Sequence, residues 1–174
     1  DALVEFHARR FGVLAASGAD LLACETIPTL DEARAYARLL KGQPGARAWL
    51  SFTSPDGVTT SHGEPLEEAA SLADRVPNVI AVGVNCVKPE VVGTAVRALA
   101  ARTRKPLVVY PNSGERWDAG DESWHGAAAH ESLAALAPGW VADGARLVGG
   151  CCRTGPEDIR ALAASLRTSS RCSA

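Results

Sequence analysis

Methionine is missing from the sequence altogether, so the chain also lacks an initiator residue. Asp1 opens directly into a helical pattern, and we therefore expect the chain to be part of a longer one. Long apolar runs are missing as well, and none approaches the roughly 20 residues that a membrane helix needs. Charged residues such as Glu5 and Arg9 interrupt the first positions, where a signal peptide would be apolar. We expect neither a membrane segment nor a secretory signal.

A surplus of positive charge is also missing. Lys and Arg total 18 against 20 for Asp and Glu, which gives a formal net charge of −2. Binding to a polyanion requires a concentrated positive face, so we expect no nucleic-acid partner. With 174 residues, the chain is long enough to bury a hydrophobic core.

Cysteine is present in an odd number, five, and two of the cysteines are adjacent, Cys151 and Cys152. Neighbouring cysteines do not easily bond to each other without strain. A secreted disulfide framework would be smaller and denser in cysteine. We therefore predict reduced thiols in a cytoplasmic protein, where metal ligation or catalysis is their natural use.

Short apolar runs alternate with helical patterns along the chain, which predicts five strand–helix units preceded by one helix. A long insertion follows the fourth strand, and a polar tail begins at Thr168. The predicted strands lie at residues 20–26, 48–53, 79–84, 106–110 and 145–148.

Continuous apolar strands, each followed by a helix, indicate an α/β protein with a parallel sheet covered on its outer face. The spacing of the units fits a (β/α)8 TIM barrel, which needs eight strands and typically ~250 residues. We therefore predict an incomplete barrel that lacks about three units. A doubly wound open sheet is the alternative, but no strand is followed by a Gly-rich dinucleotide turn.

Chemically useful residues fall at the C-terminal ends of the predicted strands, the face at which barrels build active sites. Glu25 ends the first strand, and Cys86 ends the third. Asn112 follows the fourth strand, while Cys151 and Cys152 follow the fifth. Residues scattered at random would not concentrate at one face in this way.

The third and fifth strands flank the fourth, so their tips lie about 10 Å apart, two strand spacings. Inward-pointing thiols of Cys86, Cys151 and Cys152 can then meet on one metal ion. Because neighbouring side chains in a strand point opposite ways, the chain must bend at Gly149 and Gly150. We predict zinc, since three thiolates form a soft tetrahedral site. Three ligands and one open position are typical of catalytic zinc.

Other residues compete for roles near this site. Cys24 and Cys172 fit packing better than ligation, since free cysteine is often buried. His7 should be solvated on the first helix. Trp117 and Trp124 either cover the site as a lid or pack within the insertion. Three histidines are possible rival ligands or substrate contacts: His62, His125 and His130.

Four runs at strand ends form an ordered set of motifs: Leu22-Ala23-Cys24-Glu25-Thr26, Gly83-Val84-Asn85-Cys86, Val109-Tyr110-Pro111-Asn112-Ser113-Gly114-Glu115 and Gly149-Gly150-Cys151-Cys152-Arg153. In order and approximate spacing they resemble the homocysteine S-methyltransferase family. The likeness is strongest to the branch that uses S-methylmethionine or S-adenosylmethionine, and it spans nearly the whole chain.

The resemblance implies a (β/α)8 barrel with zinc on Cys86, Cys151 and Cys152. It implies that Glu25 binds the amino group of homocysteine, and we expect Asn112 to contact substrate as well. The implied reaction transfers a methyl group from a sulfonium donor to the zinc-bound homocysteine thiolate, giving methionine.

The opening motif of the family has no counterpart in this chain. We therefore expect residues 1–167 to form the C-terminal portion of the barrel and residues 168–174 a polar tail, with the missing N-terminal part as a partner. Two alternatives stay open. One is a betaine- or corrinoid-dependent relative with the same zinc site. The other is an inactive barrel fragment that binds zinc, or a partner through its open edge.

Overall fold

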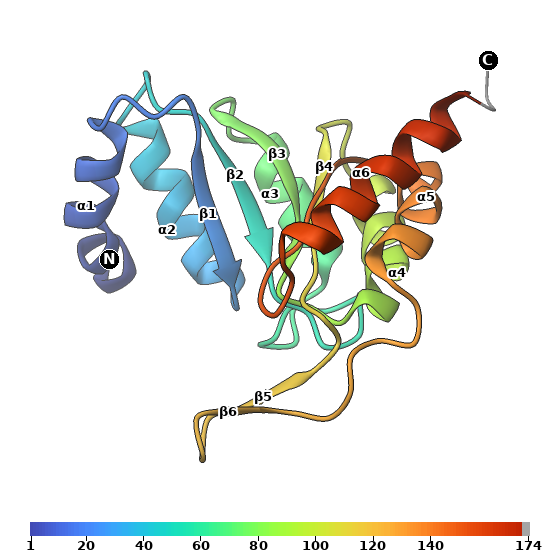
Figure 1. The fold of residues 1–174 in the computed structure, drawn as a ribbon. Coiled ribbons are helices and arrows are strands. Elements are labelled where there is room, and N and C mark those ends of the chain that lie inside the picture. Colours follow the sequence, from blue (N-terminus) through green and yellow to red (C-terminus); the bar gives the residue numbers. More distant parts are fainter. Residues whose placement is uncertain (172–174) are drawn as a thin grey trace.

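The computed structural model describes residues 1–171, and the side chains of residues 1–168. Its centre is a sheet of five strands in the order β1-β2-β3-β4-β7 (Figure 1). Every neighbouring pair in this sheet is parallel. The strands are β1 (Leu22–Ile27), β2 (Ala48–Phe52), β3 (Val79–Asn85), β4 (Leu107–Tyr110) and β7 (Ala145–Val148).

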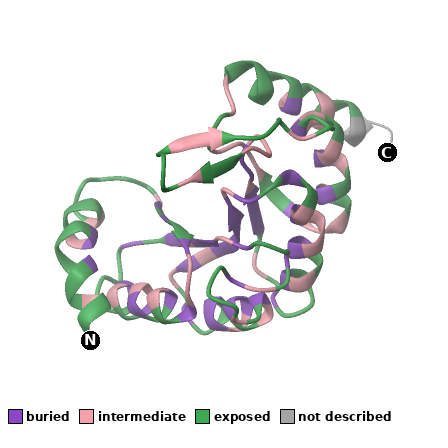
Figure 2. Ribbon diagram, turned by 90° about the horizontal axis from the view of Figure 1, so that it is seen from below, coloured by how far each residue is buried: buried purple, intermediate pink, exposed green. Residues whose placement is uncertain are grey.

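The helices lie on one side of the sheet, and each contacts the next along the chain. Seen along the strands, they form an outer arc around the buried strands (Figure 2). A doubly wound sheet would reverse its strand order at a switch point, but this order follows the sequence throughout. The predicted incomplete barrel is therefore confirmed. The helices are α1 (Ala2–Ala15), α2 (Leu30–Lys41), α3 (Leu66–Asp74), α4 (Pro89–Ala100), α5 (Leu133–Asp143) and α6 (Pro156–Arg171).

The core lies between the sheet and this arc of helices. Strand residues such as Leu50, Phe52 and Val82 are fully buried, and they meet helix residues such as Leu66 and Val96, which are buried as completely. The strands are apolar on both faces because one face meets the helices and the other faces the barrel interior. The C-terminal ends of all five strands consequently open onto one common face.

Helix α2 begins at a side-chain cap, because the Thr29 hydroxyl accepts the Glu32 N–H at 3.1 Å. The Glu32 carboxylate instead lies 2.9 Å from His7 Nε2. His7 is only 2% exposed, so the expectation that it is solvated was wrong. Helix α1 packs against α2 and turns this side chain inward, where Tyr36 also contacts the ring.

Two segments differ from the sequence-based expectation. The insertion contains an antiparallel hairpin, β5 (Arg116–Asp118) and β6 (Ser123–His125), where we expected only a loop. Helix α6 continues to Arg171 instead of ending near Arg167, because no glycine or proline interrupts residues 168–171. Cys172 lies outside the described residues. None of the described helices is long and apolar enough to cross a membrane.

Candidate metal centre

Three cysteines gather at the C-terminal face of the sheet. Cys86 follows β3, while Cys151 and Cys152 follow β7, and β4 separates these two strands. The three sulfur atoms all lie within 4.8 Å of one another. Cys86 Sγ is 3.5 Å from Cys152 Sγ, which is 4.0 Å from Cys151 Sγ. The predicted meeting of these three thiols across the mouth is thus present in the fold.

The loop after β7 holds the cysteine pair in place against β4. Its backbone continues the β4 contacts, since Gly149 N–H donates to Val109 and Cys151 N–H donates to Pro111, at 2.9 and 2.8 Å. The Thr154 hydroxyl then donates to the Cys151 carbonyl at 2.7 Å and closes the turn. A Cβ at position 150 would lie 2.3 Å from that hydroxyl oxygen. A side chain at position 150 would therefore displace the Thr154 hydroxyl that closes this turn.

The thiols of Cys86 and Cys151 resist ionisation in the absence of a cation. Burial and, to a lesser extent, the neighbouring Cys152 and Cys151 sulfurs together raise the pKa of Cys86 to about 12. Burial also raises the pKa of Cys151. A bound divalent cation reverses this preference, because it stabilises the thiolate directly. The cluster is therefore electrostatically suited to a soft metal ion.

The spacing of the sulfur atoms also fits such an ion. With Zn–S bonds of about 2.3 Å, ligands at two corners of a tetrahedron lie roughly 3.8 Å apart. The observed separations of 3.5 and 4.0 Å fall on either side of that value. Within the described part of the chain, no histidine or carboxylate joins the three cysteines in a ligand cluster. Three sulfur ligands leave one coordination position for a fourth group.

Glu25 lies at the tip of β1, on an irregular stretch of the strand. The register with β2 shifts between Cys24 and Ile27, where three steps along β1 match two steps along β2. Such a bulge re-aims a side chain, and the Glu25 side chain is exposed. Burial raises the pKa of Tyr110, and the nearby Glu25 carboxylate raises it further. The structure therefore places Glu25 beside Tyr110 and outside the cysteine cluster.

Asn112 is buried beside the loop that follows β3 and carries Cys86. Its Nδ2 donates to the Cys86 carbonyl at 3.2 Å, and its Oδ1 accepts the Gly114 N–H at 2.8 Å. Its backbone N–H donates to the Val87 carbonyl. These contacts hold the loop that carries Cys86, and whether Asn112 also contacts substrate stays a prediction.

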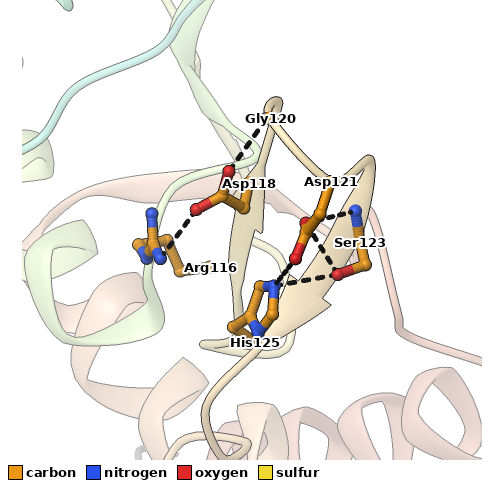
Figure 3. Close-up of polar contacts among 6 residues, drawn as sticks. All are labelled: Arg116, Asp118, Gly120, Asp121, Ser123 and His125. Carbon is orange, nitrogen blue, oxygen red and sulfur yellow. Dashed lines mark hydrogen bonds and ion pairs between the residues drawn. The ribbon is translucent and has the colours of Figure 1, made fainter.

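The histidines named from the sequence lie apart from the thiols. His125 sits on the hairpin, where its Nε2 contacts Asp121 at 2.7 Å and Ser123 at 2.8 Å (Figure 3). Both contacts fall on the same nitrogen, so this group cannot act as a Ser-His-Asp relay, which uses both ring nitrogens. His62 contacts Glu64 at 3.8 Å. Cys24 is buried within β1, as a packing role requires.

The hairpin carries two paired tryptophans and lies beyond the C-terminal ends of the main strands (Figure 1). Trp117 pairs with Trp124 across the strands, with ring centroids 5.6 Å apart. Near its base, Glu115 accepts two hydrogen bonds from Arg153, at 3.1 and 3.3 Å. The hairpin is therefore tied to the residue that follows the cysteine pair.

Sequence reasoning missed several residues that shape this site. Asn85 and Tyr110 were quoted within motifs but given no role, and Trp49 was treated only as a strand residue, although the Tyr110 hydroxyl accepts the Trp49 Nε1–H at 2.9 Å. Glu115 and Arg153 lie within the quoted motifs, which was the available signal, but nothing local indicated that they pair.

The family described as homocysteine S-methyltransferase matches residues 1–166. The chain belongs to the homocysteine S-methyltransferase family. Homocysteine S-methyltransferase YbgG of Bacillus subtilis is 47% identical over 168 residues, which are 97% of this chain and 53% of that protein. Homocysteine S-methyltransferase of Escherichia coli is 48% identical over 165 residues, 94% of this chain and 53% of that protein.

A solved structure in the homocysteine S-methyltransferase family extends the likeness to three dimensions. The metallated form of the E. coli homocysteine methyltransferase MmuM superposes with a TM-score of 0.80 at 44% identity. The alignment covers 94% of this chain and 51% of that one. The chain thus spans about half the length of the relatives it matches.

Proposed function

We propose that this chain carries the zinc site of a homocysteine S-methyltransferase, with Cys86, Cys151 and Cys152 as the ligands. The reaction would transfer a methyl group from S-methylmethionine or S-adenosylmethionine to the homocysteine thiol and give methionine. The observation that carries the proposal is the group of three sulfur atoms within 4.8 Å at the C-terminal face. The existence of a metallated form of the related MmuM supports a bound metal.

Three thiolates with an open fourth position favour zinc among the common metal ions. A free thiol has a pKa near 8.5 and is a poor nucleophile at neutral pH. Bound zinc would supply a Lewis acid that keeps a coordinated thiol deprotonated. In this chain, the thiol of Cys152 is exposed while those of Cys86 and Cys151 are partly buried. An acceptor thiol would therefore approach the cluster from the side of the exposed Cys152.

Glu25 supplies the charge that recognises the other end of the acceptor. Its carboxylate is exposed at the same face, and no ion pair within residues 1–168 uses it. A carboxylate at a partly enclosed mouth favours a cationic partner, and an amino-acid ammonium fits that requirement. Asn112, whose amide holds the loop that carries Cys86, would also contact the substrate.

The chain corresponds to the C-terminal portion of the barrel, with residues 1–167 forming strand–helix units. Two features support this assignment: the coverage of about half of each relative and the open sheet, whose edge strands are β1 and β7. Open edges present unpaired N–H and C=O groups and favour association. Residues 1–174 expressed alone should self-associate in light scattering and lack methyl transfer. A monodisperse, active monomer would contradict the assignment.

The ligand set is tested by metal analysis of the purified full-length protein. The wild type should hold about one zinc per chain, and both Cys86→Ser and Cys152→Ser should lose most of it. Cys24→Ser is the matched control, because Cys24 is buried in β1 away from the cluster. It should keep its zinc. Full zinc retention by both cluster variants would refute the site. A separate homocysteine methylation assay with each donor would identify the donor class.

A further inference from the structure

Asn85 connects two strand tips that lie far apart in the sequence. Its side chain is completely buried at the end of β3. Its Oδ1 accepts the backbone N–H of Thr26 at 2.9 Å, and its Nδ2 donates to the Thr26 hydroxyl at 2.9 Å. The same Nδ2 donates to Cys151 Sγ at 3.9 Å. One amide thus contacts the residue after Glu25 and one of the three clustered thiols.

The orientation of this amide follows from the donors and acceptors around it. A backbone N–H can only donate, so the atom facing Thr26 N must be the amide oxygen. The amide nitrogen is then fixed on the other side, where it has two hydrogens to donate. One hydrogen goes to the Thr26 hydroxyl, and the other is aimed at the sulfur of Cys151. A buried side chain with every group paired is rigid.

Two residues next to the Asn85 amide, its hydrogen-bond partner Thr26 and its chain neighbour Cys86, have an unusual backbone conformation. Thr26 has φ of 61° and Cys86 has φ of 53°, both in the left-handed region. A β-branched residue rarely adopts this region, and such outliers cluster at functional sites. Regular strand geometry would point Asn85 and Cys86 to opposite faces. The turn at Cys86 lets Asn85 reach Cys151 while Cys86 itself faces Cys152.

We propose that Asn85 is a positioning residue that sets the Cys151 sulfur for metal binding and holds the Glu25 strand tip at a set distance from it. The proposal rests on the zinc site proposed above. An N–H donor aimed at a sulfur stabilises the negative charge of the thiolate. The two hydrogen bonds between Asn85 and Thr26 connect that sulfur to β1. Glu25, the residue before Thr26, faces the acceptor ammonium. Asn85 therefore couples the two ends of the acceptor site.

The test uses Asn85→Ala in the full-length protein, with zinc affinity measured by chelator competition. Partners of metal ligands typically contribute 10–100-fold in affinity, so we expect zinc binding to weaken about 10-fold or more. Asn78→Ala is the matched control, because Asn78 lies just before β3, at its other end. Its amide donates to the carbonyls of Leu40 and Gln43. It should lose stability without losing zinc affinity.

Two further readouts separate positioning from folding. In the Co²⁺-substituted protein, loss of an N–H···S bond should shift the sulfur-to-metal charge-transfer band to lower energy in Asn85→Ala and leave it unchanged in Asn78→Ala. Thr26→Val removes the hydroxyl that accepts from Asn85 but keeps the backbone N–H. It should raise the KM for homocysteine more than it lowers kcat, whereas Thr26→Ser should restore the wild-type value.

The outcomes distinguish this inference from the proposed function. If the wild type binds no zinc, the zinc site itself fails. If the wild type binds zinc and Asn85→Ala matches it in zinc affinity and in the Co²⁺ spectrum, the role of Asn85 is overturned and the site stands. Equal losses of zinc affinity in Asn85→Ala and Asn78→Ala would likewise overturn it, because the effect would then be one of stability.

Discussion

Replacing Gly83 by alanine tests how closely β3 and β4 must approach beneath the metal site. Gly83 lies opposite Val108 in the parallel pair. A Cβ at position 83 would lie 1.6 Å from the Val108 carbonyl oxygen and 2.6 Å from its carbonyl carbon. Ordinary contacts begin near 3.4 Å, and backbone atoms cannot rotate away as a side chain can. The strands would have to separate by roughly 2 Å, judged from that overlap.

The expected cost follows from the contacts that such a separation breaks. Hydrogen bonds flank position 83 on both sides: Val82 N–H donates to Pro106 at 3.2 Å, and Cys86 N–H donates to Tyr110 at 3.1 Å. Each lost bond costs about 1 kcal/mol, and overpacking a core adds about 1–3 kcal/mol. We expect Gly83→Ala to lower the free energy of unfolding by about 3 kcal/mol.

Urea denaturation followed by circular dichroism measures this loss in the full-length protein. Gly149→Ala is the matched control, because its added Cβ would meet Tyr110 Cβ at 3.5 Å, an ordinary contact. Its stability should change by less than about 0.5 kcal/mol. Zinc content should fall with stability in Gly83→Ala, since Cys86 lies three residues further along the strand. Wild-type stability in Gly83→Ala would refute the close approach of the two strands.

Three further predictions concern single side chains. Lys105 donates to three backbone carbonyls between the end of α3 and the start of β3, at 2.5–2.8 Å. Lys105→Met should lower the free energy of unfolding by about 2 kcal/mol and leave the zinc content unchanged. An unchanged free energy of unfolding would show that these hydrogen bonds do not stabilise the fold. Burial raises the pKa of Cys24 from 9.0 to about 12, so the folded state holds this proton more tightly than the unfolded chain. The contribution of the protonated Cys24 thiol to stability is therefore complete below pH 9 and is lost as the pH rises towards 12. The stability of the wild type relative to Cys24→Val should fall by up to about 1.4 kcal/mol per pH unit above pH 9, and a constant difference would contradict burial of the thiol. Glu25→Gln should raise the KM for homocysteine about 10–100-fold, since charged hydrogen bonds contribute about 1.5–3 kcal/mol; an equal loss of zinc would indicate a folding role instead.

Local signals were enough to predict the five strands of the main sheet and the alternation of strands with helices. The apolar run from Val79 to Val84 and the cap at Thr29 both act within a few residues, so they are visible in the sequence. The same is true of Pro89 at the start of α4. The hairpin was missed because its strands are three residues each and mostly polar. His7 was wrongly expected to be solvated because it is buried by α2, a helix that is separated from α1 in the sequence by β1.

Residue types and strand ends by themselves identified the three thiols, because the C-terminal ends of parallel strands must share one face. Only the tertiary structure decided which side chains meet there. Asn85 reaches Thr26 across 59 residues and Cys151 across 66, and Arg153 pairs with Glu115 across 38. Such pairs depend on the bulge in β1 and on left-handed turns at single residues. Periodicity and composition report local preferences, so they carry no information about these distant contacts.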